Sequence, residues 1–387
     1  MTPEVARARI ALRPELRAFI TLTSESGAGD LIAVKDVFDV EGLPTTSGWR
    51  GGQSPAERDS SVIATARRGG CIVIGKTNLD PWCCGALGVN PDFGDIRNPR
   101  AVNRLAGGSS GGSSAAVAAG LCDWAIGTDS AGSVRIPASL CGVVGFKPTF
   151  GWADLSGVAP HSPSLETVGI LAPTVAAVSR AFTVLGGAGA GADSRAIQST
   201  RAGHGIAVPA QWIYGLDPAT SQTWHRVSQG LPTVELPERD RFVAARSLIA
   251  VAEAAHSNHS LLVSRPEAYT PKLARVLRAG LRISADELAA ARRAADDLRS
   301  ELMHAMDDFD ALLLPTTAAT APLATRPGPE EPLVRFTSPF SLTGQPSISV
   351  PGPSAGLPVG VQLVGRPGKD IELLQIAANL EQQWQSD

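Results

Sequence analysis

The chain has 387 residues, and its 34 lysines and arginines against 37 aspartates and glutamates give a formal charge of −3. This balance excludes the clustered positive charge with which proteins bind the phosphates of nucleic acids. Hydrophobic residues make up 43% and charged residues 18%, which predicts a folded protein with a sizeable core and not a disordered chain. No apolar run approaches the ~18 residues that span a bilayer. Segment 1–22 is interrupted by Arg and Glu and lacks the apolar region of a secretion signal.

The cysteines are odd in number and lie mostly in apolar surroundings. Such cysteines are typical of a reducing compartment and not of a disulfide framework. We therefore expect a cytoplasmic protein without membrane attachment. The five are Cys71, Cys83, Cys84, Cys122 and Cys141.

Residues 59–70 predict a short helix that begins at a capping Asp59 and ends at two glycines, followed by a buried strand at 71–74. Residues 70–77 also match the spacing of a Walker A phosphate-binding loop. That function is excluded on physical grounds, because the four interior residues are the predicted strand and cannot wrap their N–H groups around a phosphate. We expect Lys76 to be structural.

The same helix-then-strand order recurs twice. Residues 112–120 form a run of small residues typical of a close-packed helix, and 121–126 follow as a strand. Ser284 and Glu287 make a capping box at the start of a long amphipathic helix, with a strand at 310–315. Alternating helices and strands of this kind predict an α/β fold with a mostly buried sheet.

Two glycine-rich segments resemble nucleotide or nucleophile motifs without their context. Residues 107–111 fit the G-x-S-x-G nucleophile elbow, but no strand precedes them and none of the six histidines is an obvious partner. A plain Gly/Ser linker also fits poorly, because small apolar residues follow at once. Residues 187–192 imitate a dinucleotide fingerprint after a helix-like segment, and we expect a loop at 185–194.

A third pattern combines one lysine with two serine-rich segments. Lys35 lies among apolar residues, where burial favours the neutral amine, a competent general base. Ser109 lies in the first serine-rich segment, and small residues at 129–132 precede Ser133 and expose backbone N–H groups that could stabilise an oxyanion. Each feature alone fits a snorkelling lysine or a turn-forming serine. Together they predict a serine hydrolase site without histidine.

These segments, with others along nearly the whole chain, make the sequence resemble the amidase signature family. One block carries the lysine, two form the Gly/Ser region, and three lie near the carboxyl end. A single block would be unspecific, whereas the ordered set is highly specific. The blocks are 33–48, 105–120, 127–151, 310–322, 338–351 and 356–381.

The resemblance implies a fold and a domain organisation. The fold would be α/β, a single large domain with a central mixed β-sheet covered by helices on both faces. We expect one amidase domain over 1–387. Within it we expect a signature core at about 30–185, a shortened substrate-facing region at about 185–300, and carboxyl-terminal core blocks at about 301–387.

The resemblance also implies a Ser-cisSer-Lys triad. Ser133 would be the nucleophile and Lys35 the base, with Ser109 as proton relay after a cis Gly108–Ser109 peptide bond. The implied oxyanion hole is formed by four backbone N–H groups, those of Ser130, Ala131, Gly132 and Ser133. The implied reaction hydrolyses a carboxamide to an acid plus ammonia or an amine through an acyl-enzyme, without a cofactor.

Relatives often place acyl-pocket residues where Trp82, Cys83 and Cys84 stand in this chain. The adjacent cysteines also raise the alternative of a metal site, but no second Cys or His cluster has ligand spacing, and we predict no metal. Apolar pocket or core residues are the preferred interpretation.

The chain departs from the family in three ways, one of which is a shortened lead-in at 23–31 before the lysine block. Ala131 stands where many members have glycine, and region 185–300 is trimmed, which implies an open pocket or one completed by a homodimer or partner subunit. The partner in catalysis would be a small-molecule amide, whether aryl, aliphatic, peptide or urea-type, with no nucleic acid or membrane. Two alternatives stay open: the A subunit of a glutamine-dependent tRNA amidotransferase, and a non-catalytic interaction protein on the same fold.

Overall fold

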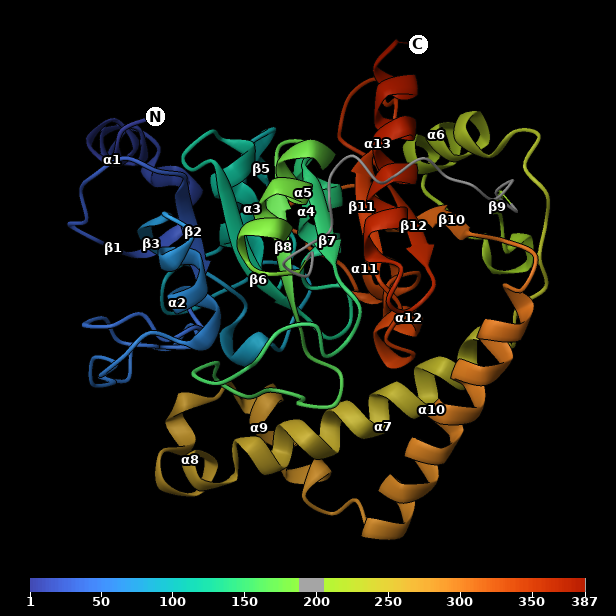
Figure 1. The fold of residues 1–387 in the computed structure, drawn as a ribbon. Coiled ribbons are helices and arrows are strands. Elements are labelled where there is room, and N and C mark those ends of the chain that lie inside the picture. Colours follow the sequence, from blue (N-terminus) through green and yellow to red (C-terminus); the bar gives the residue numbers. More distant parts are fainter. Residues whose placement is uncertain (188–204, 387) are drawn as a thin grey trace.

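The computed structural model describes residues 1–187 and 205–386. In this part of the chain, a ten-stranded sheet has the order β1-β3-β2-β6-β8-β7-β11-β12-β10-β9 (Figure 1). Its strands are β1 Phe19–Leu22, β2 Leu31–Lys35, β3 Ile72–Thr77, β6 Trp124–Asp129, β7 Val144–Lys147, β8 Thr167–Ala172, β9 Ile206–Ala207, β10 Ala311–Pro315, β11 Ser347–Pro351 and β12 Gly360–Gly365. A separate two-stranded ribbon pairs β4 Arg97–Asn98 with β5 Ala101–Leu105.

The sheet is mixed, as predicted. Strand β2 runs parallel to both β3 and β6, and β10 runs parallel to β9. The other neighbours in the order are antiparallel. Because β2 and β6 are adjacent and parallel, their carboxyl ends lie at the same edge of the sheet, where ligands of α/β proteins commonly bind.

Helices cover both faces of the sheet, which confirms the predicted architecture. Side chains alternate along each strand, so Ile32 belongs to the apolar cluster that includes residues of α2, α5 and α13, while Ala33 belongs to the cluster that includes residues of α3 and α4. Toward the other end of the sheet, Leu312 belongs to a third cluster, which includes residues of α7, α10 and α12. These helices are α2 Ser61–Arg68, α3 Gly111–Ala118, α4 Arg135–Cys141, α5 Val175–Val184, α7 Arg239–Ser257, α10 Ala285–Ala305, α12 Ser338–Leu342 and α13 Asp370–Ser386.

The remaining helices lie at the periphery. The chain begins with α1, and α8 and α9 lie with α7 and α10 in a helical layer below the sheet in the view of Figure 1. None of the described helices is both long enough and apolar enough to cross a bilayer. Their bounds are α1 Pro3–Ala11, α6 Pro218–Ser228, α8 His259–Ser264, α9 Pro271–Gly280 and α11 Glu331–Val334, with 3-10 turns η1 Pro14–Leu16, η2 Pro81–Cys83, η3 Ala210–Trp212 and η4 Pro266–Ala268.

The predicted helix–strand pairs are present, with two corrections. The first helix is capped at Ser60 and not at Asp59, whose carboxylate instead pairs with Arg67 and accepts the Glu41 N–H. The strand expected at 121–126 begins at Trp124 and continues to Asp129. Local apolar pattern marks a strand but not its ends, because the ladder with β8 determines how far it extends.

Two other sequence predictions have clear outcomes. The capping box at the start of α10 is present, with both Ser284 and Glu287 contributing their hydrogen bonds. Segment 72–77 is the buried strand β3, and Lys76 forms an ion pair with Asp36 (2.7 Å) in which both side chains are buried. The loop predicted at 185–194 lies mostly outside the described residues.

Candidate active site

Lys35 is the last residue of β2, and its side chain is fully buried. Its Nζ donates hydrogen bonds to Ser109 Oγ at 2.8 Å and to Thr128 Oγ1 at 2.9 Å. Thr128 lies near the end of β6, so the parallel pairing of β2 and β6 brings the amine and the hydroxyl to one edge of the sheet. Two acceptors of different elements therefore fix the direction of the lysine.

Ser109 lies in the tight segment that leads into α3. The Gly108–Ser109 peptide bond is cis, as the resemblance implied. Gly108 has no room for a side chain, since a Cβ there would lie 1.7 Å from Oδ2 of Asp80. The Asp80 carboxylate accepts N–H groups of Gly88 and Val89, and the Gly108 N–H donates to the nearby Ala86 carbonyl at 2.9 Å.

Ser133 lies in the turn between β6 and α4. Its carbonyl accepts the Ser110 N–H at 3.0 Å, which joins this turn to the segment of Ser109. In the described part of the chain, no hydrogen bond connects the Ser109 and Ser133 hydroxyls, and the Ser133 hydroxyl has no partner. Its side chain lines a cavity, so the hydroxyl is available to a bound molecule.

The turn before Ser133 is shaped by Asp129. The Asp129 carboxylate accepts the N–H groups of Gly132 (2.7 Å) and Val134 (3.2 Å) and pairs with the buried guanidinium of Arg135. Burial by itself would raise the pKa of Asp129, but Arg135 lowers it to about 2. The carboxylate is therefore charged at neutral pH and holds the turn from within.

The four N–H groups predicted for an oxyanion hole differ in their surroundings. The Gly132 N–H is directed at Asp129, whereas those of Ser130, Ala131 and Ser133 have no acceptor among the described residues. The Ala131 carbonyl accepts a hydrogen bond from Thr337 Oγ1 at 2.6 Å, which fixes the orientation of the following peptide unit. Three free donors next to the Ser133 hydroxyl can stabilise a developing negative charge.

Ser133 opens into a cavity of about 190 Å³ at the carboxyl edge of β2 and β6. Engineered cavities of roughly 150 Å³ admit benzene, so this volume suits a small substrate. Two of the three predicted pocket residues, Cys83 and Cys84, line it. Helices α7 and α9 supply another wall, with Arg246, Ala250, Val251, Ala254, Leu273, Val276 and Leu277.

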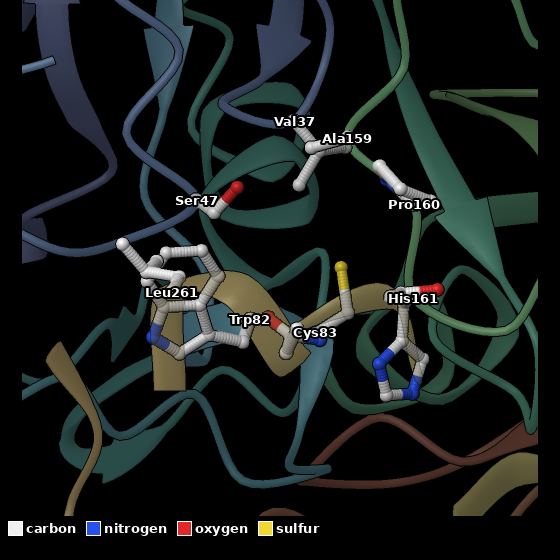
Figure 2. Close-up of a pocket in the computed structure, with 10 residues that line it drawn as sticks. Val37, Ser47, Trp82, Cys83, Ala159, Pro160, His161 and Leu261 are labelled. Atoms are coloured by element: carbon white, nitrogen blue, oxygen red, sulfur yellow. The ribbon is translucent and has the colours of Figure 1, made fainter. Parts of the chain in front are cut away.

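The third predicted pocket residue, Trp82, lines a smaller adjoining cavity of about 110 Å³ (Figure 2). Cys83 and His161 belong to the walls of both cavities. The Trp82 ring packs on Tyr269 with centroids 5.0 Å apart, and its Nε1 donates to the Ala268 carbonyl at 2.9 Å. Trp82 therefore anchors the helical layer to the sheet edge.

The two adjacent cysteines are neutral thiols in this environment. Burial raises the pKa of both Cys83 and Cys84, and the Cys84 Sγ lies 3.8 Å from Nδ1 of His161. Burial lowers the pKa of His161 to about 4, so its imidazole is neutral as well. The described residues hold no group of three or more His, Cys, Asp or Glu side chains that could bind a metal.

Sequence reasoning missed several residues that support the site. Thr128 and Asp129 follow within three residues of the strand predicted at 121–126, a position at which polar residues commonly serve a site, and this signal was available. Thr337 and Arg246 lie far from the serine segments in sequence. No local pattern marks them, because only the tertiary packing of α7 and α12 brings Arg246 to the cavity and Thr337 to the Ala131 carbonyl.

Known proteins share both this fold and this sequence pattern. The sequence profile of the family described as Amidase matches residues 28–374. The A subunit of the glutamyl-tRNA(Gln) amidotransferase of Symbiobacterium thermophilum is 33% identical over 452 residues, covering 97% of this chain and 91% of the relative. The fatty acid amide hydrolase of Medicago truncatula is 32% identical, covering 91% of this chain and 64% of the relative. A crystal structure of an amidase superposes with a TM-score of 0.91 at 30% identity, covering 99% of this chain and 96% of that one.

These matches and the fold define an enzyme class whose members act on the carbon–nitrogen bonds of amides. The chain belongs to the amidase signature family, which confirms the resemblance found in the sequence.

Proposed function

We propose that this protein hydrolyses a small carboxamide to a carboxylic acid plus ammonia or an amine through an acyl-enzyme on Ser133. The observation that carries the proposal is the 2.8 Å hydrogen bond from buried Lys35 Nζ to Ser109 Oγ. The Lys35–Ser109 pair lies beside a turn in which the Ser133 hydroxyl is free and lines a cavity. A lysine amine and a serine hydroxyl in contact can pass a proton to and from a nucleophile.

In the proposed acylation step, the neutral Lys35 amine takes a proton from Ser109 as Ser109 takes the proton of Ser133. The Ser133 Oγ forms a bond to the carbonyl carbon, and the oxyanion is stabilised by the free backbone N–H groups of Ser130, Ala131 and Ser133. Removing one such donor costs about 2.7–4 kcal/mol in other acyl-transfer enzymes. The proton returns through Ser109 to the nitrogen, the C–N bond breaks, and the amine leaves.

In the proposed deacylation step, water takes the place of the amine. Ser109 and Lys35 remove a proton from the water as its oxygen attacks the ester carbon. The bond to Ser133 Oγ then breaks, Ser133 regains its proton, and the acid leaves. No cofactor is needed, because the steps transfer only protons and an acyl group and change no oxidation state.

The proposal also includes the domain layout. We propose that region 185–300 forms the substrate-facing part, since α7 and α9 supply a wall of the cavity. We propose a cytoplasmic location, supported by the five cysteines, which are all free thiols.

A fluorophosphonate probe tests the nucleophile without knowledge of the substrate. Activated serine displaces fluoride from phosphorus and gains a fixed mass. We expect one adduct on the wild type, mapped to Ser133 and absent from S133A and K35A, with the K35A defect partly relieved at raised pH. S354A, which changes a serine in a separate depression beside α6, is the matched control and should label like the wild type. Near-normal labelling or amide hydrolysis by S133A would overturn the assignment.

A second candidate function is the A subunit of a glutamine-dependent amidotransferase. The observation in its favour is the 33% identity with such a subunit over nearly the whole chain. The two functions differ in their need for a partner. Glutaminase activity that appears only with a co-purified subunit would establish the second function, whereas amide hydrolysis by the isolated chain at full rate would establish the first.

A further inference from the structure

The guanidinium of Arg246 faces the cavity of Ser133 without a counterion. Its Nη1 donates to the Ser130 carbonyl at 3.4 Å, the single hydrogen bond that Arg246 makes within the described residues. No described carboxylate oxygen lies within 4.0 Å of it. A guanidinium carries five N–H donors in a planar fork, and Arg246 lines the cavity with one of them bonded to a described residue.

The nearby acids and arginines are already paired. Asp129, whose charge acts on Arg246, is held by Arg135. On the same helix as Arg246, Arg239 pairs with Asp240 and Glu331, and Arg241 pairs with Glu301. Burial lowers the pKa of Arg246 to about 10, so it is a cation at neutral pH. A partly desolvated cation without a partner is unfavourable, and an anion bound in the cavity would remove that cost.

Arg246 lies at one end of the stretch of α7 that lines the cavity with small side chains. Ala250 and Ala254 follow at one and two helical turns, and both line the same cavity. Phe242 and Ile249 anchor the helix in the core. A short molecule can therefore lie along the alanines and contact Arg246, which is held on a rigid element close to the turn of the nucleophile.

We propose that Arg246 binds a carboxylate carried by the amide substrate, so that the enzyme selects short amides that also bear a carboxylate. A planar guanidinium matches the two oxygens of a carboxylate with two parallel hydrogen bonds. Arg246 contacts Ser130, three residues before Ser133, which places the anionic group only a few bonds from the scissile carbonyl. This inference rests on the proposed function, since it concerns the same cavity.

Among the described residues that line the cavity, Glu330 is the one acid. Glu330 lines the cavity from the start of α11. Its carboxylate interacts with the backbone of Ala86 and with the positive charge of Lys272. Burial raises the pKa of Glu330. Glu330 also supplies a control, since E330Q changes the charge of the same cavity without touching Arg246.

Paired primary amides test the preference. Succinamate is compared with 4-oxopentanamide, and malonamate with 3-oxobutanamide, so that an acetyl group replaces the carboxylate at the same position. Released ammonia gives kcat/KM. We expect the wild type to prefer a carboxylate member by about 10- to 100-fold, as charge-assisted hydrogen bonds allow. Equal kcat/KM within both pairs would overturn the inference.

The variants assign the preference to Arg246. R246Q should remove it by lowering kcat/KM for the carboxylate amide alone, and R246K should keep part of it, since charge remains but the fork is lost. E330Q and the exposed R241Q should keep the preference. If R246Q lowers kcat/KM equally for both members of a pair, or if E330Q removes the preference, Arg246 does not bind the carboxylate.

A binding measurement separates this inference from the proposed function. In calorimetry on S133A, succinamate should bind about tenfold or more tightly than 4-oxopentanamide, and S133A/R246Q should lose the difference. An enzyme that shows this binding difference but hydrolyses no amide would refute the proposed function alone. Hydrolysis with no binding difference would refute the role of Arg246 alone.

Discussion

Arg135 holds the carboxylate of Asp129 with two hydrogen bonds, Nε to Oδ2 at 2.9 Å and Nη2 to Oδ1 at 2.8 Å. Both side chains are fully inaccessible to solvent. The same carboxylate accepts the Gly132 N–H, so the ion pair determines the shape of the turn that carries Ser133. Stability and the geometry of the nucleophile are therefore linked through one buried pair.

Removing the cation should destabilise the fold strongly. We expect Arg135→Met to lower the free energy of unfolding by about 3–5 kcal/mol, because it leaves Asp129 buried and uncompensated. Urea denaturation followed by fluorescence gives this value. The control is Arg241→Met, which breaks an exposed pair with Glu301 and should leave the midpoint nearly unchanged. Equal midpoints for the two variants would contradict the role of the buried pair.

Gly132 should not tolerate a side chain. Its φ is +125°, and a Cβ would lie 2.1 Å from Thr337 Oγ1, the group that holds the Ala131 carbonyl. Gly120 also has positive φ (+63°) but has open space around it, so Gly120→Ala measures the backbone cost alone. We expect Gly132→Ala to cost about 1–3 kcal/mol more in urea denaturation than Gly120→Ala and to slow fluorophosphonate labelling. Similar losses of unfolding free energy in both variants would show that the Thr337 side chain moves aside without cost.

Thr128 should direct the Lys35 amine toward Ser109. Thr128→Val keeps the shape but removes the acceptor 2.9 Å from Lys35 Nζ. We expect labelling of Ser133 to slow by about 10- to 100-fold, the size of a misplaced catalytic group. Thr77→Val is the matched control, because it removes a buried hydroxyl bonded to Ser113 and not to Lys35. Unchanged labelling by Thr128→Val would show that Ser109 alone orients the amine.

His161 should make the fold less stable in mild acid. Its folded pKa of about 4 lies below its ordinary value of 6.5, so between these values only the unfolded chain binds the proton. The stabilising contribution is complete above pH 6.5 and is lost as the pH falls toward 4. We expect a loss on the order of 2–3 kcal/mol from this group.

The measurement is the difference between the wild type and His161→Gln in urea denaturation from pH 7 to 4. A difference is needed because Asp80, whose pKa is raised to about 7, binds its extra proton in the folded state and acts in the opposite direction. The variant should lose less stability than the wild type as the pH falls. Substitution of the exposed His304 controls for the loss of one histidine, and parallel curves for the wild type and His161→Gln would refute the prediction.

Much of the fold could be predicted because its signals are local. The capping box of Ser284 and Glu287, the small residues of α3 and the apolar run of β3 each specify an element from a few neighbouring residues. The cap of α2 was misplaced by one residue. Asp59 and Ser60 are both good caps on sequence grounds, and the pairing of Asp59 with Arg67 decided between them.

The sequence by itself determined the family, the mixed α/β fold and the segments that contain Lys35, Ser109 and Ser133. Only the tertiary structure decided what surrounds them. Thr337 reaches the oxyanion turn, and Arg246 reaches the cavity, because α12 and α7 pack against the sheet edge from positions more than 100 residues away along the chain. Contacts between residues so far apart in sequence depend on how whole helices and strands pack, and a local pattern of residues does not predict them.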